Sequence, residues 1–432
     1  MSLSSRSPSL DALRGFALLG ILPMNVIAFA LPADAYINPM APGIAAHCGT
    51  LSGIDRIAWI FTHSLFDLKM VSIFAMLFGA GIALQTGAHA GGREIPVAPG
   101  TAKAHYRRMF VLLILGLIHA YAMWFGDILT LYAVSGMLLY PLRRFKPLTL
   151  CILAAILFML PILILSGLAA LLNWAQSDAH QAQAILDAGG TLTLEQQEAL
   201  EHWDDGLGLT DSPDEVANSI AAMREGFWAS LGEQARETLE TQLSFFAVFI
   251  WRPMAMMLLG MALVKTRFFA GHWPAAKMNT LAALGLLIGA PLVAIGVSRL
   301  LTHNFDFVQL FLIDGHFNYV GSLALSLAFS ALVIRFAATH PDAAITQRLA
   351  AVGRMSLTNY LLHTVLAIIT FRTFGLFGQL WMAELWLFTI PVWILQLVLS
   401  PLWQRHFGAG PMERLWRKLA GRAPAPASFP DK

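Results

Sequence analysis

Residues 148–172 read LTLCILAAILFMLPILILSGLAALL, and this stretch decides the fold class. It contains no Asp, Glu, Lys or Arg. A helix of about 20 apolar residues, rising about 1.5 Å per residue, crosses the roughly 30 Å hydrocarbon core of a bilayer. The stretch therefore predicts a transmembrane helix.

The composition of the whole chain agrees with a protein embedded in lipid. Of its 432 residues, 57% are hydrophobic and 12% are charged, and the mean hydropathy is +0.63. A soluble domain carries about 25% charged residues to hydrate its surface, so the composition excludes a soluble protein. The net charge is only +2 and no dense basic stripe occurs along the chain, which excludes a nucleic-acid partner.

Apolar windows of similar length predict an all-α, polytopic membrane bundle of about ten transmembrane helices. The chain then divides into an N-terminal membrane bundle in residues 1–172, an insertion at 173–242, a C-terminal membrane bundle in 243–404 and a tail at 405–432. The expected spans lie near residues 10–31, 66–87, 107–125, 128–143, 148–172, 243–264, 278–300, 317–338, 350–373 and 381–403.

The basic residues of the loops indicate how the bundle is oriented. With about ten spans they fall on one side of the membrane, and the positive-inside rule makes that side the cytoplasm. Both termini are then cytoplasmic. These basic residues are Arg93, Lys103, Arg107, Arg108, Arg143, Arg144, Lys146, Lys265, Arg267, Arg405, Arg414, Arg417 and Lys418.

The insertion at 173–242 agrees with this orientation because it falls on the opposite side. It holds 14 acidic residues against two basic ones. Capping signals at Thr193 and at Ser212-Pro213 predict short helices, so we expect a small helical cap outside the membrane. The acidity fits a solvated surface, and the alternative is a binding site for a cationic acceptor.

Polar residues within the first span need an explanation. A charged side chain at membrane depth costs at least about 2.5 kcal/mol on insertion scales, so each one needs a partner or a function. Asp11, Arg14 and Asn25 share one helical stripe. Asp11 and Arg14 can form an ordinary interfacial ion pair, or Arg14 can hold a phosphate that enters from the cytoplasm. Asn25 lies deeper, where its amide either joins two helices or polarises a carbonyl.

The segment GLIHAYAMWFGDIL at 116–129 is the most informative one for chemistry. It places His119 in the outer half of the third span and Asp127 at the turn into the fourth. A carboxylate within reach of an imidazole sets its tautomer and favours its charged form, which equips the histidine as a general base. The alternative is a hydrogen-bonded core histidine and an aspartate that caps the next helix.

Two further groups of polar residues enter the membrane in other spans. His63, Asp67 and Lys69 lie at the start of the second span, and the first two are spaced as metal ligands on one helical face. No third ligand is evident nearby, so we expect no metal site. Arg252 in the sixth span stands next to a proline and is a candidate anion site or a partner for Asp127.

The ninth span begins with GRMSLTNY at 353–360. Arg354, Asn359 and Tyr360 in this run are candidate substrate-binding residues. Asn359 shares a helical face with His363, and polar contacts between packed helices explain the run as well as a site does.

Several of these motifs recur together in one known family. They are LDALRGFALLGI at 10–21 with Asn25, FAMLFGAG at 74–81, LIH at 117–119 with GDIL at 126–129, GMAL at 260–263, GRMSLTNY at 353–360 and GPMERLWR at 410–417. In these motifs the chain resembles the YeiB family of bacterial membrane proteins, many of which carry a C-terminal domain of unknown function. The resemblance covers almost the whole chain and implies the bacterial inner (plasma) membrane as its location.

The N-terminal pattern also looks like that of the heparan-α-glucosaminide N-acetyltransferases and, more distantly, the membrane O-acyltransferases. Those enzymes pass an acyl group from cytoplasmic acyl-CoA to a sugar on the other side of the membrane. The resemblance therefore implies acyl transfer. The likeness to the heparan-α-glucosaminide N-acetyltransferases, which are lysosomal, ends after Asn25. The resemblance therefore assigns their catalytic histidine to neither His47 nor His63.

We therefore expect a membrane acyltransferase that moves an acyl (acetyl) group from cytoplasmic acyl-CoA to an extracytoplasmic sugar or amine acceptor. Acyl-CoA (acetyl-CoA) is the expected co-substrate, membrane lipid surrounds the protein, and the oligomeric state is open between a monomer and a homodimer. The competing interpretation is a transporter or flippase of a small solute or lipid-linked precursor. The expected catalytic residues are His119, Asp127 and Asn25, and the expected substrate-binding residues are Arg14, Arg252, Asn359, Tyr360 and Arg354.

Overall fold

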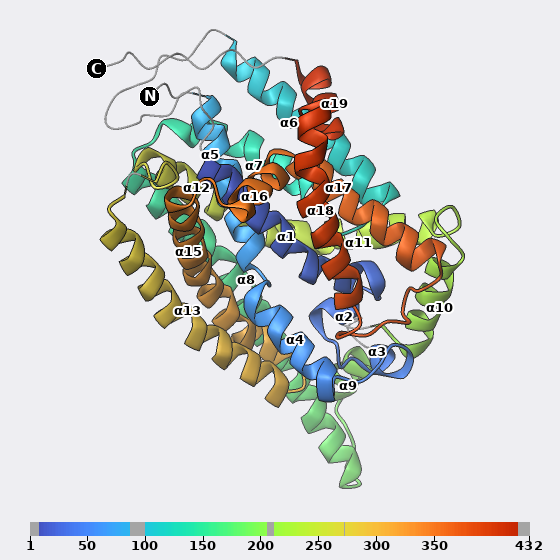
Figure 1. The fold of residues 1–432 in the computed structure, drawn as a ribbon. Helices are drawn as coiled ribbons and strands as arrows, with labels where there is room; N and C mark the ends of the chain where they lie inside the picture. Colours follow the sequence, from blue (N-terminus) through green and yellow to red (C-terminus); the bar gives the residue numbers. More distant parts are fainter. Residues whose placement is uncertain (1–7, 87–99, 205–210, 272, 422–432) are drawn as a thin grey trace.

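The structure, a computed structural model, describes residues 8–86, 100–204, 211–271 and 273–421. Within these residues every regular element is a helix and no strand occurs. The chain is therefore an all-α protein, as predicted, and its helices pack into the bundle shown in Figure 1. Arg93 and the end of the expected tail, residues 422–432, lie outside the described residues.

The helices divide into an N-terminal set, an insertion and a C-terminal set. The N-terminal set contains α1 (Pro8–Ala30), α2 (Asp34–Ile37), α3 (Pro42–His47), α4 (Gly53–Leu65), α5 (Lys69–Gln85), α6 (Thr101–Ala122), α7 (Leu129–Leu139), the 3₁₀-helix η1 (Tyr140–Arg144) and α8 (Pro147–Asp187). The insertion adds α9 (Leu194–Asp204), α10 (Pro213–Arg224) and α11 (Leu231–Phe249). The C-terminal set contains α12 (Trp251–Lys265), α13 (Ala275–Thr302), α14 (Phe307–Gln309), the π-helix η2 (Leu310–Asp314), α15 (Gly315–Thr339), α16 (Ala344–Arg354), α17 (Ser356–Ala367), the π-helix η3 (Ile368–Thr373), α18 (Trp386–Phe407) and α19 (Pro411–Ala420).

Six helical stretches of the described chain are long and apolar enough to cross a membrane, which identifies a membrane protein. The other expected spans correspond to helices that are shorter, broken or more polar, namely α6, α7 with η1, α11 with α12, and α16 with α17 and η3. A count of about ten crossings therefore stays a prediction. The six stretches are Pro8–Ala30, Gly53–Gln85, Pro147–Asp187, Ala275–Thr302, Phe307–Thr339 and Trp386–Phe407.

The stretch Gly53–Gln85 is not one continuous helix, because it breaks between α4 and α5. Leu68 at the break has a φ of +59°, in the left-handed region that residues with a Cβ rarely adopt. Its neighbours Asp67 and Lys69 are 7% and 0% exposed. The break thus turns two charged side chains into the interior. His63 and Asp67 precede it and still meet, with 3.5 Å between Nδ1 and Oδ2, as their spacing had predicted.

Helices α5 and α12 cross in close contact because each presents a glycine to the other. A Cβ at Gly79 would overlap the backbone of Met257, and a Cβ at Gly260 would overlap the carbonyl of Met76. Small residues at such a crossing let two backbones approach, and the resulting dispersion contacts hold helices together inside a membrane. The crossing fixes where the start of α12 lies against the start of α5.

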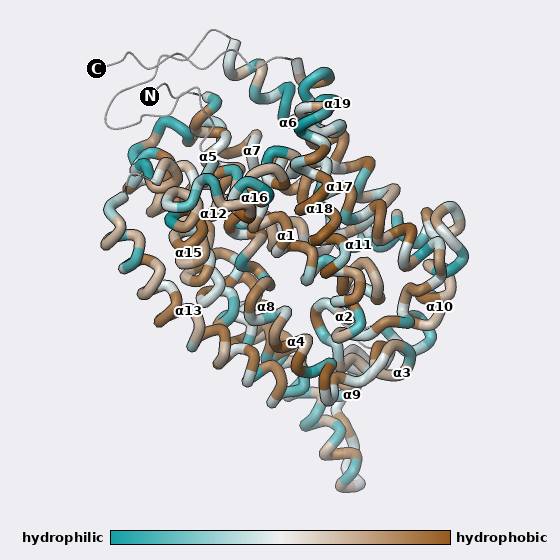
Figure 2. The backbone as a smooth tube through the Cα atoms, in the orientation of Figure 1, coloured by the Kyte–Doolittle hydropathy of each residue, from teal (hydrophilic) through white to brown (hydrophobic). Residues whose placement is uncertain are grey.

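The basic residues of the loops come together at one end of the bundle, which we call the basic end. Trp416 on α19 donates from Nε1 to the Arg108 carbonyl on α6 at 3.2 Å. Lys265 on α12 donates from Nζ to the Phe145 carbonyl at 2.6 Å. Figure 1 shows α19 and the start of α6 at this end, and Figure 2 shows that both carry many hydrophilic residues, whereas α13, α15 and α18 are mostly hydrophobic.

The acidic insertion lies at the opposite end, which we call the insertion end. Helix α8 continues without a break beyond the expected span at 148–172 to Asp187, so the insertion begins as an extension of a membrane helix. Helix α10 opens with a capping box in which Ser212 and Glu215 exchange hydrogen bonds, as predicted. Arg224 at its end donates from Nε to the Phe377 carbonyl at 2.7 Å. The insertion is therefore tied to the C-terminal set.

Candidate functional site

A chain of hydrogen bonds joins a carboxylate, an imidazole and a hydroxyl inside the bundle. Asp127 Oδ1 lies 2.8 Å from His119 Nδ1, and His119 Nε2 lies 2.9 Å from Thr364 Oγ1. His119 sits in the last turn of α6, Asp127 in the turn before α7, and Thr364 on α17. The structure therefore brings together the two residues singled out from the sequence and adds a third. We call Asp127, His119 and Thr364 the polar triad.

Asp127 also performs the capping role that the alternative interpretation expected. Its Oδ2 accepts the backbone N–H of Thr130 at 2.7 Å, in the first turn of α7. The N–H groups of a first helical turn have no partner within the helix, so this bond stabilises both the helix and the carboxylate. One oxygen of Asp127 is thereby fixed to α7 while the other orients His119.

The polar triad is shielded from solvent. The side chains of His119 and Asp127 are each 1% exposed, and Thr364 is 0% exposed. The Tyr360 ring lies 5.3 Å from the His119 ring, and the Tyr360 hydroxyl accepts the N–H of Ile128 at 3.3 Å. Electrostatic interactions are stronger in such a dry site than in water because the local dielectric is low.

Asn25 lies on the side of α1 that faces this region. It precedes Ala28 and Phe29 by about one helical turn. Trp124 contacts both of these residues, since its Nε1 donates to the Ala28 carbonyl at 3.3 Å and its ring lies 4.3 Å from that of Phe29. The Trp124 ring in turn lies 6.3 Å from that of His119. The Asn25 Nδ2 is buried and has no hydrogen-bond partner within the described part of the chain.

Arg14 and Arg354, two of the expected substrate-binding residues, lie at the basic end. Arg14 Nη1 is 3.1 Å from Asp11 Oδ1, which confirms the predicted ion pair, and Arg354 Nη1 is 3.9 Å from Asp11 Oδ2. Arg354 also donates from Nε to Gln404 at 2.7 Å. The two arginine side chains are 25% and 38% exposed. Arg14 lies about 16 Å along α1 from Asn25, so these arginines and the polar triad occupy different depths.

Asn359 joins α17 to its neighbours. Its Nδ2 donates to the Val352 carbonyl at 3.2 Å and to Ser400 Oγ on α18 at 3.0 Å. One turn later His363 Nε2 lies 3.0 Å from Gln396 Oε1, also on α18. These contacts are the polar helix packing that was the alternative to a substrate site.

Arg252 does not pair with Asp127, which was one of the two roles that the sequence left open for it. Arg252 donates to the Tyr319 carbonyl at 2.9 Å, to Ser72 Oγ at 3.1 Å and to Ser322 Oγ at 2.7 Å. The close crossing of α5 and α12 carries Arg252 to the start of α5, whereas Asp127 is bound to α6 and α7. Arg252 therefore belongs to a different group of polar residues.

Thr364 is a site residue that the sequence did not reveal. A threonine in an apolar helix carries no signal of its own, because its hydroxyl usually bonds to the backbone of the same helix. Thr364 meets His119 only because α17 packs against α6 in the folded protein. Among the residues that the structure describes, no group of three His, Cys, Asp or Glu side chains is placed to hold a metal ion.

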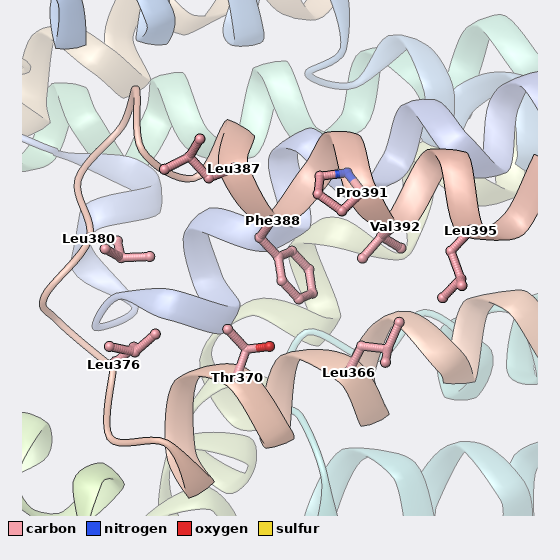
Figure 3. Close-up of a pocket in the computed structure, with 9 residues that line it drawn as sticks. All are labelled: Leu366, Thr370, Leu376, Leu380, Leu387, Phe388, Pro391, Val392 and Leu395. Atoms are coloured by element: carbon pink, nitrogen blue, oxygen red, sulfur yellow. The ribbon is translucent and has the colours of Figure 1, made fainter.

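An apolar groove runs along the helices that follow Thr364. Its volume is about 470 Å³, within the range of small-molecule pockets. Figure 3 shows Leu366 and Thr370 on one side and Phe388, Val392 and Leu395 of α18 on the other. Apart from the Thr370 hydroxyl the labelled lining is apolar, which suits the hydrocarbon part of a ligand.

Comparison with known proteins finds relatives along the whole chain. Residues 263–423 match a family model described as "Protein of unknown function (DUF418)". The chain is 30% identical over 433 residues to "Uncharacterized protein YeiB" of Escherichia coli (strain K12), covering 98% of each chain. It is 29% identical over 416 residues to "Uncharacterized protein YxaH" of Bacillus subtilis (strain 168), covering 94% of this chain and 92% of that one. No solved structure matches. Together with the motifs and the helical membrane fold, these matches show that the chain belongs to the YeiB family.

Proposed function

We propose that the protein is a membrane acyltransferase in which His119 acts as the general base and acyl-CoA is the acyl donor. The observation that carries the proposal is the polar triad. A carboxylate, an imidazole and a hydroxyl that are hydrogen-bonded in this order form the arrangement that Ser-His-Asp enzymes use for acyl transfer. The resemblance of the N-terminal motifs to acyl-CoA-dependent acetyltransferases supports the same chemistry.

The two hydrogen bonds of His119 define its tautomer. An ionised carboxylate only accepts hydrogen bonds, so Nδ1 carries the proton toward Asp127 and Nε2 presents its lone pair toward Thr364. In the proposed reaction an acceptor hydroxyl or amine displaces Thr364 from Nε2 and attacks the thioester carbonyl while its proton passes to Nε2. The carbon–sulfur bond then breaks, and the CoA thiolate takes this proton. Asp127 stabilises the imidazolium that exists in between.

The donor would enter from the basic end, which we assign to the cytoplasm of a bacterial inner membrane. Arg14 and Arg354 are part-exposed there, and guanidinium groups bind phosphates such as those of CoA. The pantetheine arm would extend along α1 toward Asn25. Its buried Nδ2 is suited to donate a hydrogen bond to the thioester oxygen as negative charge develops.

The acceptor, a sugar or an amine, would arrive from the insertion end. The apolar groove of α17, η3 and α18 offers a place for the hydrocarbon tail of a lipid-anchored acceptor. Its lining residue Leu366 lies on the same helix as Thr364 but about 200° around the helix axis, so the tail would lie on another face of α17 than the polar triad. A lipid-linked glycan combines such a tail with hydroxyl groups.

An acetyl-transfer assay on purified protein in detergent tests the proposal. Acetyl-labelled acetyl-CoA is mixed with a lipid and glycan extract of bacterial membranes, and labelled product and free CoA thiol are measured. His119→Ala and His119→Gln should each lower the transfer rate by about 10² to 10⁴, because neither side chain can accept the proton. His105→Gln is the matched control, since His105 is also buried on α6 but bonds only to the Gly136 carbonyl in the described contacts. Full activity of a folded His119→Gln protein would eliminate the assignment.

Thr364 variants separate direct transfer from transfer through an acyl-enzyme. If the acceptor takes the acyl group directly, Thr364→Val retains most activity, because the threonine only marks the place of the acceptor. If Thr364 Oγ1 carries the acyl group, Thr364→Val is inactive, and label from acetyl-CoA remains on the unchanged protein after denaturation. Thr364→Ser keeps the hydroxyl and should be active in both cases.

A transporter is the second candidate, and the broken stretch α4–α5 favours it. Transporters bind solutes at interrupted helices that hold polar groups inside the membrane, and Asp67 and Lys69 flank such an interruption. Product formation that requires acetyl-CoA would favour the transferase. Solute flux into liposomes without acetyl-CoA would favour the transporter.

A further inference from the structure

A second group of buried polar residues lies around the break between α4 and α5. It consists of Asp67, Lys69, Arg252 and Asn318, which are 7%, 0%, 6% and 3% exposed, and we call it the charged cluster. We infer that the charged cluster is a binding site for one anionic group, a carboxylate or a phosphate. This inference does not rest on the acyltransferase proposal.

Lys69 is held by neutral acceptors. Its Nζ donates to Asn318 Oδ1 at 2.6 Å and to the His63 carbonyl at 3.0 Å. Asn318 donates in turn from Nδ2 to Asp67 Oδ2 at 2.6 Å. The Asn318 amide therefore bridges the ammonium and the carboxylate and sets the distance between them.

Arg252 adds a second buried cation to the charged cluster. Its guanidinium hydrogen-bonds to the Tyr319 carbonyl and to the hydroxyls of Ser72 and Ser322, all of them neutral. The guanidinium carbon also lies 4.3 Å from the centre of the Tyr319 ring. The Nε–H of Arg252 is buried and meets no acceptor within the described residues. A buried donor without an acceptor destabilises the native protein, so a ligand that supplies an acceptor to this N–H would bind favourably.

The charges of the cluster do not balance when they are counted over the described residues. Lys69 and Arg252 act electrostatically on each other and on Asp67, so two cations share one carboxylate. An uncompensated charge buried away from water is costly, and a membrane protein has less water to offer it. One additional negative charge would balance the cluster. A metal ion or a cationic solute would increase the imbalance.

Two residues lead from the cluster toward the insertion end. His63 Nδ1 lies 3.5 Å from Asp67 Oδ2, and the Tyr36 hydroxyl hydrogen-bonds to the same aspartate. Tyr36 belongs to the short helix α2 and is 39% exposed. Figure 1 shows α2 near α3, which packs on α10 of the insertion. Tyr36 and His63 therefore mark the side from which the anionic group would enter.

Thermal unfolding of the purified full chain in detergent tests the inference. Sodium acetate and sodium phosphate are titrated separately at neutral pH, with sodium HEPES, a bulky anion, keeping the ionic strength constant. The melting temperature should rise and reach a plateau, because a ligand that binds only the native protein stabilises it. The salt that reaches its plateau at the lower concentration identifies the group as a carboxylate or a phosphate. In Arg252→Gln the apparent affinity should fall about 10-fold to 100-fold, since a charge-assisted hydrogen bond is lost.

Two further variants keep the test decisive if Arg252→Gln folds poorly. Lys69→Met removes one cation at similar length, so, as in Arg252→Gln, the charges balance without a ligand and the apparent affinity should fall by a similar factor. Lys265→Gln also removes a buried cation from α12, but at the basic end, and it should respond as the unchanged protein does. If neither salt raises the melting temperature of the unchanged protein, the inference is overturned. An unaltered response in both Arg252→Gln and Lys69→Met would overturn it as well.

Discussion

Glu413 caps the start of α17 through Thr358, although the two residues lie on different helices. The Thr358 hydroxyl donates to Glu413 Oε2 at 2.5 Å, and the Thr358 N–H donates to Glu413 Oε1 at 3.1 Å. The N–H of Leu357 donates to the same Oε1 at 2.8 Å. Helix α19 therefore holds the first turn of the helix that carries Tyr360 and Thr364.

Replacement of this cap should weaken the whole protein. Glu413→Gln removes the charge that interacts with the positive end of α17 and weakens three hydrogen bonds, so we expect a loss of about 1–2 kcal/mol in the free energy of unfolding. Thermal unfolding in detergent measures it. Glu240→Gln is the control, because Glu240 forms an exposed pair with Arg236, and it should leave the melting temperature nearly unchanged. Equal losses in the two variants would contradict the capping role.

Asp127→Asn should impair acyl transfer far more than stability. The Asn side chain can still accept the N–H of Thr130, so α7 keeps its cap. Its amide can also donate to Nδ1 of His119, which favours the tautomer with the proton on Nε2, where the base needs a lone pair. We expect a rate loss of about 10² to 10⁴ in the acetyl-transfer assay with a melting temperature close to that of the unchanged protein. Activity near the original level would leave Asp127 with the capping role alone.

Two neighbouring glycines on α5 should respond differently to alanine. At Gly79 a Cβ would overlap the backbone of Met257, whereas at Gly81 it would meet only Gln85 Nε2 at 3.9 Å. Gly79→Ala should therefore destabilise the protein by about 1–3 kcal/mol, the usual cost of overpacking, and Gly81→Ala should be tolerated. Melting temperatures of the two variants measure the difference. Similar values for both would mean that α5 and α12 cross elsewhere.

The stability of the insertion end should depend on pH through Glu237. This residue lies on α11 outside the six long apolar stretches, and burial, with the nearby charge of Glu233, raises the pKa of its carboxyl from 4.5 to about 7. Between these values the native carboxyl keeps a proton that the unfolded chain releases, so stability falls as the pH rises from about 4.5 to 7. The fall amounts to roughly 3 kcal/mol at most.

Glu237→Gln should remove this contribution. Melting temperatures recorded from about pH 5 to 7.5 should fall less steeply in the variant than in the unchanged protein, because glutamine has no proton to release. Parallel pH curves for the two proteins would show that Glu237 is ionised in the native state.

Cysteine labelling tests the orientation of the two ends. In a chain without Cys48 and Cys151, a cysteine at the exposed Asp187 should react with an impermeant maleimide added to cells with a permeable outer membrane. A cysteine at the exposed Arg417 should react only after the inner membrane is broken. These outcomes follow from the positive-inside rule. The reverse pattern would place the basic end outside the cytoplasm.

The sequence predicted individual local features well. The capping box at Ser212 and Glu215 and the Asp11–Arg14 pair both involve residues within one helical turn, so spacing alone brings their atoms together. The sequence left the role of Arg252 open between an anion site and a partner of Asp127, because its actual partners, such as Ser322, come from helices far away in the chain. Spacing carries no information on such contacts.

The class of the molecule follows from its amino-acid sequence: an all-α membrane protein of the YeiB family with a basic end and an acidic insertion. Hydropathy, helix caps and loop charges depend on residues that are neighbours in the sequence. A bilayer also admits few folds other than a helical bundle for a chain this apolar. Helix packing, in contrast, brings Thr364 to His119 and places Lys69 and Arg252 within electrostatic reach of Asp67. Those contacts depend on which helices cross and at what depth in the bundle. The crossing and its depth are determined by the close packing of side chains along the entire length of the helices.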